Sequence, residues 1–195
     1  MNKTRLEAFS DGVIAIAITI MVLELKVPHG ETWADLIKLW PVFLSYVLSF
    51  TFVGIYWVNH HHMLHMVKHV DARVLWANLH LLFWLSLIPF VTAWMGENHF
   101  SQNPTVLYGI NALMAGLAYQ LMVLACRRAN KVHNLLGEGI KNSHKGNLSI
   151  LMYMLAIGAA YLHTAISFAL FVTVSVMWFI PDRRIEQALG SPSSK

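Results

Sequence analysis

Three polar side chains stand directly before a long apolar stretch near the start of the chain. Arg5, Ser10 and Asp11 precede residues 12–23, where every residue but Thr19 is apolar. Such a run is typical of a helix in lipid or in a tight helix bundle. Charged groups at membrane depth usually face a bundle interior or an aqueous path, so these side chains are functional candidates. The alternative is that Ser10 or Asp11 is an ordinary N-cap of the apolar helix.

The composition indicates the class of protein that must position these side chains. Of 195 residues, 56% are hydrophobic and 12% are charged, against about 25% charged in soluble domains. We therefore predict an all-α integral membrane protein in the lipid bilayer, with no cleavable signal and no nucleic-acid partner. Cys126 is the one cysteine, which excludes an intrachain disulfide and a cysteine-based metal site.

The apolar segments predict about six membrane-spanning helices at roughly 20–25 residues each. We place the first at 5–28, ending at a Pro-His-Gly breaker. The second begins near residue 39 or 41 and continues to about 70. The third covers 74–95 and is kinked by Pro89, and the fourth covers 105–126. Residues 148–180 are too long for one span, so two short helices are expected with a turn near His163. Residues 1–184 form one domain, and 185–195 a short disordered cytosolic tail.

The basic residues give an independent test of this topology. With six spans and both termini in the cytosol, the outer segments hold only Lys26 and Lys38. All other basic residues fall in cytosolic segments: Lys3, Arg5, Lys68, Arg73, Arg127, Arg128, Lys131, Lys141, Lys145, Arg183, Arg184 and Lys195. This asymmetry agrees with the positive-inside rule, and five or seven spans would remove it.

Within the first helix, three branched apolar residues share one face. Ile16, Ile20 and Leu23 are spaced i, i+4 and i+7, with Thr19 beside them. Asp11 lies about 140° away around the helix, so it points into its own subunit if the stripe faces a symmetry axis. On periodicity alone, such a stripe is more often a helix-packing seam.

The pattern Arg5-x-x-x-Phe9-Ser10-Asp11 resembles the signature of the transmembrane-protein-175 potassium channel family, in its short, single-repeat prokaryotic branch. Trp57-x-x-His60, Asn78 and the pair Pro89-Phe90 also match family positions. The resemblance implies a homotetrameric, potassium-permeable channel, with potassium as the permeant ion, no cofactor and no enzymatic activity. It implies a multi-pass protein of the prokaryotic inner (cell) membrane.

The resemblance also implies a pore. In the family, helix 1 of four subunits lines the axis, which makes Ile16, Ile20 and Leu23 the constricting rings and Thr19 a polar neighbour. The chain contains no Thr-Val-Gly-Tyr-Gly carbonyl filter, so we expect a hydrophobic gate and moderate selectivity from pore width and dehydration cost.

A supporting network follows if the first two helices are antiparallel. The start of the first helix then meets the end of the second, and the signature residues can hydrogen-bond within one subunit and fix the rotation of helix 1. The residues of this expected network are Arg5, Phe9, Ser10, Asp11, Trp57, His60 and Asn78. Otherwise, Trp57 is an interface aromatic and His60 a solvated helix end.

Two other functions compete with a channel. Asp11 and His60 could serve a proton-coupled secondary transporter, although no internal repeat is visible. The histidines between positions 60 and 69 could make a His-dependent membrane metalloprotein, since His62, His65 and His69 would share one helical face. No carboxylate lies among them, so we expect no metal site and interpret them as a cytosolic helix extension.

Overall fold

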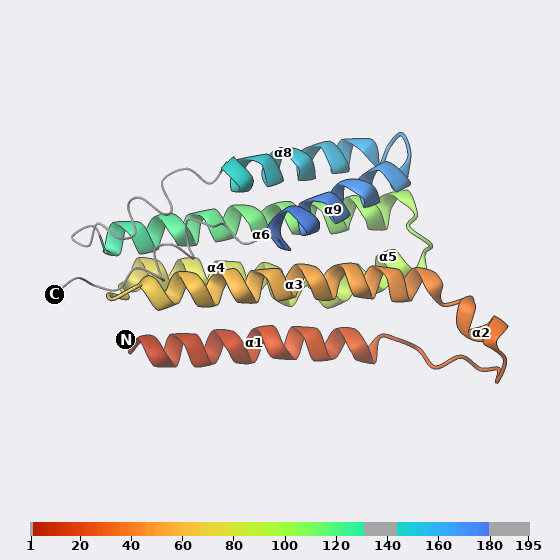
Figure 1. The fold of residues 1–195 in the computed structure, drawn as a ribbon, viewed down its shortest axis with the longest axis horizontal. Coiled ribbons are helices and arrows are strands. Elements are labelled where there is room, and N and C mark those ends of the chain that lie inside the picture. The colour runs from red at the N-terminus through yellow and green to blue at the C-terminus, as the bar shows by residue number, and fades with distance from the viewer. Residues whose placement is uncertain (1, 131–143, 180–195) are drawn as a thin grey trace.

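The computed structural model describes residues 2–130 and 144–179, and every regular element in these ranges is an α-helix. The long helices run side by side along the longest axis of the molecule, and the short α2 projects from one end (Figure 1). The helices are α1 (Lys3–Leu23), α2 (Trp33–Ile37), α3 (Trp40–Met66), α4 (Ala72–Ser86), α5 (Ile88–Glu97), α6 (Gln102–Ala129), α8 (His144–Ala159) and α9 (Thr164–Phe179).

Four stretches of the described chain are long and apolar enough to cross a membrane. They are α1, α3, the α4–α5 pair (Ala72–Glu97) and α6, while α9 is a shorter apolar helix. The expectation of an all-helical membrane protein is confirmed at this level. The tail at 185–195 lies outside the described residues.

The first helix differs from its prediction at both ends. It begins at Lys3 because the Asn2 side chain caps it, accepting a hydrogen bond from the backbone N–H of Thr4 at 3.1 Å. Neither Ser10 nor Asp11 is therefore its N-cap. It ends at Leu23 rather than near Pro28, after about 31 Å of helix, close to the roughly 30 Å of a hydrocarbon core.

A short helix, α2, was not predicted between the first two long helices. The Thr32 side chain caps it by accepting from the Asp35 N–H at 3.4 Å, and Lys38 pairs with Asp35 at 2.9 Å. The Thr32 hydroxyl, and next Lys38, lower the pKa of the Asp35 carboxyl. Threonine followed three residues later by an acid is a helix-start signal that the sequence did carry.

The next helix, α3, ends four residues before the predicted position. It stops at Met66, and Val67 is extended (φ −80°, ψ 125°). The cause is Asn130 at the end of α6. Its side-chain oxygen accepts from the backbone N–H groups of Lys68 and His69 at 3.0 and 2.9 Å. Since His69 is not on α3, the predicted face of His62, His65 and His69 does not form.

The remaining helical predictions hold with small shifts. Pro89 interrupts the third span, which divides at Leu87 into α4 and α5 because proline lacks the N–H that a continuous helix needs. The fourth span, α6, is three residues longer at each end than predicted. The last apolar segment forms two helices, α8 and α9, with a turn that includes His163, as expected.

Packing places α1 at one edge of the bundle, against α3, α4 and α5, while α8 packs on α6, and α9 packs on α8, α3 and α6 (Figure 1). Buried hydroxyls join three of the helices. Thr92 of α5 donates to Ser49 of α3 at 2.7 Å, and Ser49 donates to the hydroxyl of Tyr108 on α6 at 3.1 Å. Hydrogen bonds of this kind hold membrane helices in register where hydrophobicity alone cannot.

Gly96 marks the closest approach between α5 and α3. A Cβ at this position would lie 2.9 Å from the Val42 Cα and also meet the Ser45 hydroxyl. We expect Gly96→Ala to destabilise the protein by about 1–3 kcal/mol, because the backbone of α3 must move. Gly158→Ala is the matched control, since nothing lies within 4 Å of a Cβ there. Thermal unfolding in detergent compares the two variants. Equal unfolding temperatures would contradict the tight contact.

Candidate functional site

Two opposite faces of α1 define the site. One face is buried against the bundle, at positions spaced by three and four residues: Leu6, Ser10, Ile14, Ala17 and Met21. On the other side, Ile16, Ile20 and Leu23 are 59%, 41% and 79% exposed. Phe9, one to two turns earlier, is also exposed. The predicted stripe therefore lies on the surface of the subunit and is not a packing seam within it.

A buried chain of hydrogen bonds fixes the inner face of α1. The Asn78 amide N–H of α4 donates to the Ser10 hydroxyl at 3.0 Å, and Ser10 donates to the Leu6 carbonyl at 2.8 Å. The Asn78 oxygen lies 2.8 Å from His60 Nε2 of α3. Since an amide oxygen only accepts, Nε2 carries the proton and donates. Ser10, His60 and Asn78 are at most 1% exposed, so three helices share this network.

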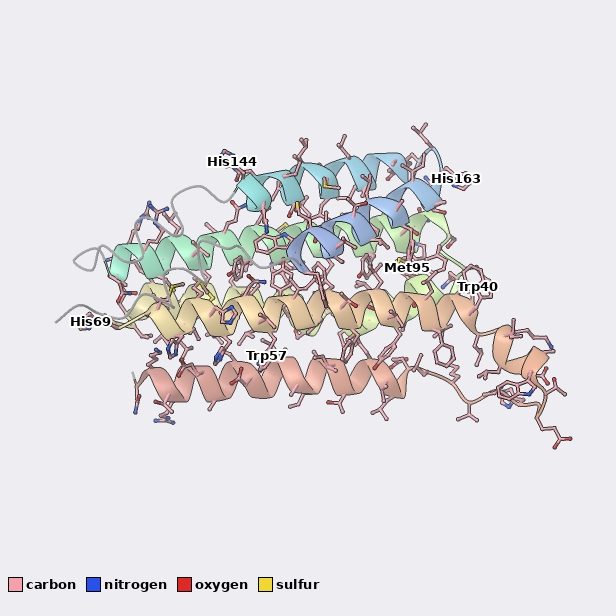
Figure 2. The ribbon with its side chains drawn as sticks, viewed as in Figure 1. Trp40, Trp57, His69, Met95, His144 and His163 are labelled. Atoms are coloured by element: carbon pink, nitrogen blue, oxygen red, sulfur yellow. The ribbon has the colours of Figure 1, made fainter. Side chains whose placement is uncertain are left out.

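A second contact holds the same turn of α1 from the outside. Trp57 Nε1 donates to Asp11 Oδ1 at 3.0 Å, and Trp57 lies between α3 and α1 in Figure 2. Both residues are exposed in the single subunit. Asp11 thus points along its own subunit toward α3, to the side of the Ile16 stripe. Its partner is the indole N–H of Trp57, a member of the expected network.

Arg5 is not brought into this network. Among the described residues its side chain makes no hydrogen bond or ion pair, and it is exposed. The reason is rotational, because Arg5 lies about 140° around α1 from Ser10. Phe9 likewise faces outward, 52% exposed. Sequence reasoning could place both in the motif but could not tell which members share a face with a partner.

Loss of the Asp11 carboxylate is expected to weaken the fold more than it changes selectivity. A hydrogen bond to a charged group is worth about 1.5–3 kcal/mol when buried, and exposure reduces this to about 1 kcal/mol. On the expectation of a tetrameric potassium channel, Asp11→Ala lowers the tetramer yield and Tm while the potassium/sodium reversal potential stays unchanged. Asp11→Asn, which keeps an acceptor for Trp57, is the control. A stable tetramer with altered selectivity would place Asp11 in the permeation path instead.

The histidines at the end of α3 separate into different environments. His60 is buried, whereas His61 and His65 are exposed and their rings stack with centroids 6.3 Å apart. His61 also stacks on Trp57, with centroids 6.1 Å apart. In the two described ranges, no group of three or more His, Cys, Asp or Glu side chains is placed to hold a metal ion.

One contact was missed from the sequence. Lys3 Nζ donates to the His65 backbone carbonyl at 3.1 Å, which ties the first turn of α1 to the last turn of α3. Because the acceptor is a backbone carbonyl, which every residue carries, the sequence gives no sign of this contact. Together with the Asp11–Trp57 bond, this contact shows that residues 3–11 of α1 run antiparallel to residues 57–65 of α3.

The residues that build this site lie within the part of the chain that matches a known protein family. The family model described as endosomal/lysosomal potassium channel TMEM175 matches residues 5–89, which include Arg5, Asp11, Trp57, His60 and Asn78. A protein of Chryseobacterium sp. (strain P1-3), named a potassium channel, is 50% identical over 189 residues, covering 97% of this chain and 98% of that protein. Human TMEM175, named an endosomal/lysosomal proton channel, is 38% identical over 96 residues, covering 43% of this chain and 19% of the human protein.

The architecture also has a solved counterpart. The crystal structure of a TMEM175 homologue from Chamaesiphon minutus, described as a lysosomal potassium-selective channel, superimposes with a TM-score of 0.71 at 26% identity. The match covers 91% of this chain and 96% of that one. The resemblance that rests on Arg5, Phe9, Ser10 and Asp11 is therefore confirmed. Since the Chryseobacterium match spans nearly the whole of both chains, the chain belongs to the TMEM175 family of potassium channels.

Proposed function

We propose that four copies of this chain form a potassium-permeable channel in which α1 of each subunit lines an axial pore. Potassium conduction is supported by the relative that matches the chain end to end, which is named a potassium channel. The single observation that carries the pore assignment is the outward-facing stripe of α1, with Ile16, Ile20 and Leu23 exposed at 59%, 41% and 79%.

Polar contacts within the subunit fix the rotation of α1 and therefore the direction of the stripe. The Ser10–Asn78–His60 network fixes the rotation of α1 on its inner face, and Asp11 holds it from the side. The network thus determines which residues four copies of α1 present to one another.

The proposed constriction acts by dehydration. Rings of branched apolar side chains pass an ion only if the pore stays wide enough to keep water, and they close by dewetting. Thr19 beside the rings donates its hydroxyl proton to the Ala15 carbonyl, so its oxygen still accepts from water. Selectivity for potassium over sodium then depends on pore width and on the higher cost of dehydrating sodium.

We further propose six spans with both termini in the cytosol of a prokaryotic cell, in the inner membrane. The start of α1, the end of α3 and the end of α6 meet at one end, as the Lys3–His65 and Lys68–Asn130 contacts require (Figure 1). Seven described basic residues belong to that end: Lys3, Arg5, Lys68, Arg73, Arg127, Arg128 and Lys145. Lys26 and Lys38 belong to the other end. This distribution supports a cytosolic location for the first.

The transporter alternative is weakened by the hydrogen bonds of its two relay groups. Asp11 bonds to Trp57, and His60 bonds to Asn78. A proton relay between Asp11 and His60 would need these bonds to exchange. Conduction through an axial pore leaves both hydrogen bonds in place, so the channel agrees better with the contacts of Asp11 and His60.

The test is potassium flux from vesicles that contain the purified protein, together with a count of chains in detergent. We expect four chains per particle and a potassium flux larger than the sodium flux under equal gradients. The same vesicles, with a pH-sensitive dye, report any proton flux, which the name of the human relative makes the natural second measurement. Flux no greater than from empty vesicles, or flux from a monomer, would overturn the proposal.

A further inference from the structure

Two stripes of side chains with polar groups face each other where the first half of α1 (residues 3–11) packs on the last part of α3 (residues 57–65), and these two segments are called the inner halves below. On α1, Lys3, Glu7 and Asp11 follow at intervals of four residues, and such residues stack on one helix face. On α3, Trp57, His61 and His65 do the same. The outer members are joined across the interface. Asp11 accepts from Trp57 at 3.0 Å, and Lys3 donates to the His65 carbonyl at 3.1 Å.

The register of these two contacts fixes the middle pair. The helices are antiparallel, so moving four residues forward on α1 corresponds to moving four residues back on α3. Starting from Lys3 opposite His65 and ending at Asp11 opposite Trp57, the halfway position sets Glu7 opposite His61.

Glu7 has only a loose partner in the structure. Its carboxylate lies 3.7 Å from Lys3 Nζ, one turn earlier on α1, and both side chains are about one-third exposed (31% and 29%). This distance is near the upper limit of an ion pair. Lys3 is also engaged with the His65 carbonyl. The Glu7 carboxylate is thus available to a new cation on α3.

The other groups around His61 do not compete for that carboxylate. On α3, His60 is bonded to Asn78, and the exposed ring of His65 stacks on His61. His62, one residue on, is displaced by about 100° around the helix. On α1, Asp11 is bonded to Trp57. On α4, the charged residues of this end, Asp71 and Arg73, pair with each other at 3.4 Å.

We propose that Glu7 and His61 form a proton-dependent ion pair that completes the contact between the inner half of α1 and the end of α3. With His61 neutral, only the outer two of these three polar contacts are made. When His61 takes up a proton from solution, its imidazolium ring faces the Glu7 carboxylate, and the middle contact closes. Histidine changes charge between about pH 8 and pH 5, within the range that cells experience.

His61 is accessible to solvent protons. The 27 residues of α3 span about 40 Å, which exceeds the roughly 30 Å of a hydrocarbon core. His61 is exposed and lies five residues from the end of α3. The inference depends only on the contact of α1 with α3 within one subunit, so it stands or falls separately from the axial pore.

A double-mutant cycle tests the pair. Wild type, Glu7→Gln, His61→Gln and the double variant are unfolded thermally in detergent at about pH 5.5 and about pH 8. At the lower pH we expect Glu7→Gln to lower Tm by about 1–3 °C more when His61 is present than when it is Gln. At the higher pH the two effects are equal. The Lys3–Glu7 pair cancels in the cycle because it is lost in both backgrounds.

Two further variants make the test decisive. His62→Gln is the matched control and leaves the coupling unchanged. Glu7→Lys inverts the sign, so acid lowers its Tm relative to that of the same variant carrying His61→Gln. A coupling that is absent at both pH values, or equal at both, overturns the proposal. If the cycle shows no pH-dependent coupling but potassium flux is normal, the Glu7–His61 pair is wrong and the channel assignment stands. If the coupling is present but the protein passes no potassium, the channel assignment is wrong and the pair stands.

Discussion

Ile16→Asn is expected to raise potassium conductance and to weaken discrimination against sodium. Ile16 is the first of the three exposed branched residues on α1, and a polar ring in its place holds water more readily. The dehydration barrier then falls for both ions. A reduction of only about 0.5–1 kcal/mol corresponds to a roughly two- to fivefold faster passage. Because sodium costs more free energy to dehydrate, its barrier falls more than that of potassium, and the reversal potential shifts.

The measurement for Ile16→Asn is single-channel amplitude and reversal potential in bilayers with potassium on one side and sodium on the other. Val176→Asn is the control, because Val176 on α9 is a branched residue of nearly equal exposure, 57% against 59%, remote from α1. We expect the control to conduct as wild type does. Unchanged amplitude and unchanged reversal potential in Ile16→Asn would remove Ile16 from the pore.

Asn78→Leu is expected to be the most destabilising single change in the site. Asn78 is fully buried and bonds to both Ser10 and His60. Leucine has a similar volume but leaves the buried His60 N–H without an acceptor and Ser10 without a donor. Each buried polar group left unpaired costs about 1–3 kcal/mol, so the loss for the two groups is about 2–6 kcal/mol. In addition, α1 loses the contact that sets its rotation.

Asn111→Leu provides the comparison for Asn78→Leu. Asn111 of α6 is also a buried asparagine in an apolar helix, but it makes one bond, to the Trp84 carbonyl at 3.2 Å. Its side-chain oxygen has no partner among the described residues. Replacing it removes an unpaired polar group, so the cost is small. Thermal unfolding and tetramer yield measure both. Equal losses of stability in the two variants would contradict the claim that the Ser10–Asn78–His60 network stabilises α1 more than an ordinary buried asparagine does.

The sequence predicted that three branched residues share one face of α1, because this depends on local periodicity. A spacing of three and four residues puts Ile16, Ile20 and Leu23 on one side, and the bundle buries Ser10 on another. The division of the third span at Pro89 and the turn near His163 follow from equally local causes. In each case the deciding residues lie within a few positions of the feature that they determine.

Features decided by distant residues could not be predicted in this way. The end of α3 at Met66 depends on Asn130, more than sixty positions away, which binds the backbone of the following turn. The exclusion of Arg5 from the network that contains Asp11 and Trp57 depends on the rotation of α1 relative to α3. The functional roles of the motif residues and of the pore rings stay predictions, because one subunit does not form the axis.

The most direct measurement of the central claim is cysteine modification at Leu23 during potassium conduction. Leu23 is the most exposed member of the stripe, at 79%, and the native thiol, Cys126, is fully buried and replaced by alanine in the background. If α1 lines the pore, a water-soluble, positively charged thiol reagent reaches Leu23→Cys and reduces the potassium current, while Val176→Cys on α9 conducts unchanged. Full modification of Leu23→Cys with no change in the current would contradict an axial pore lined by α1.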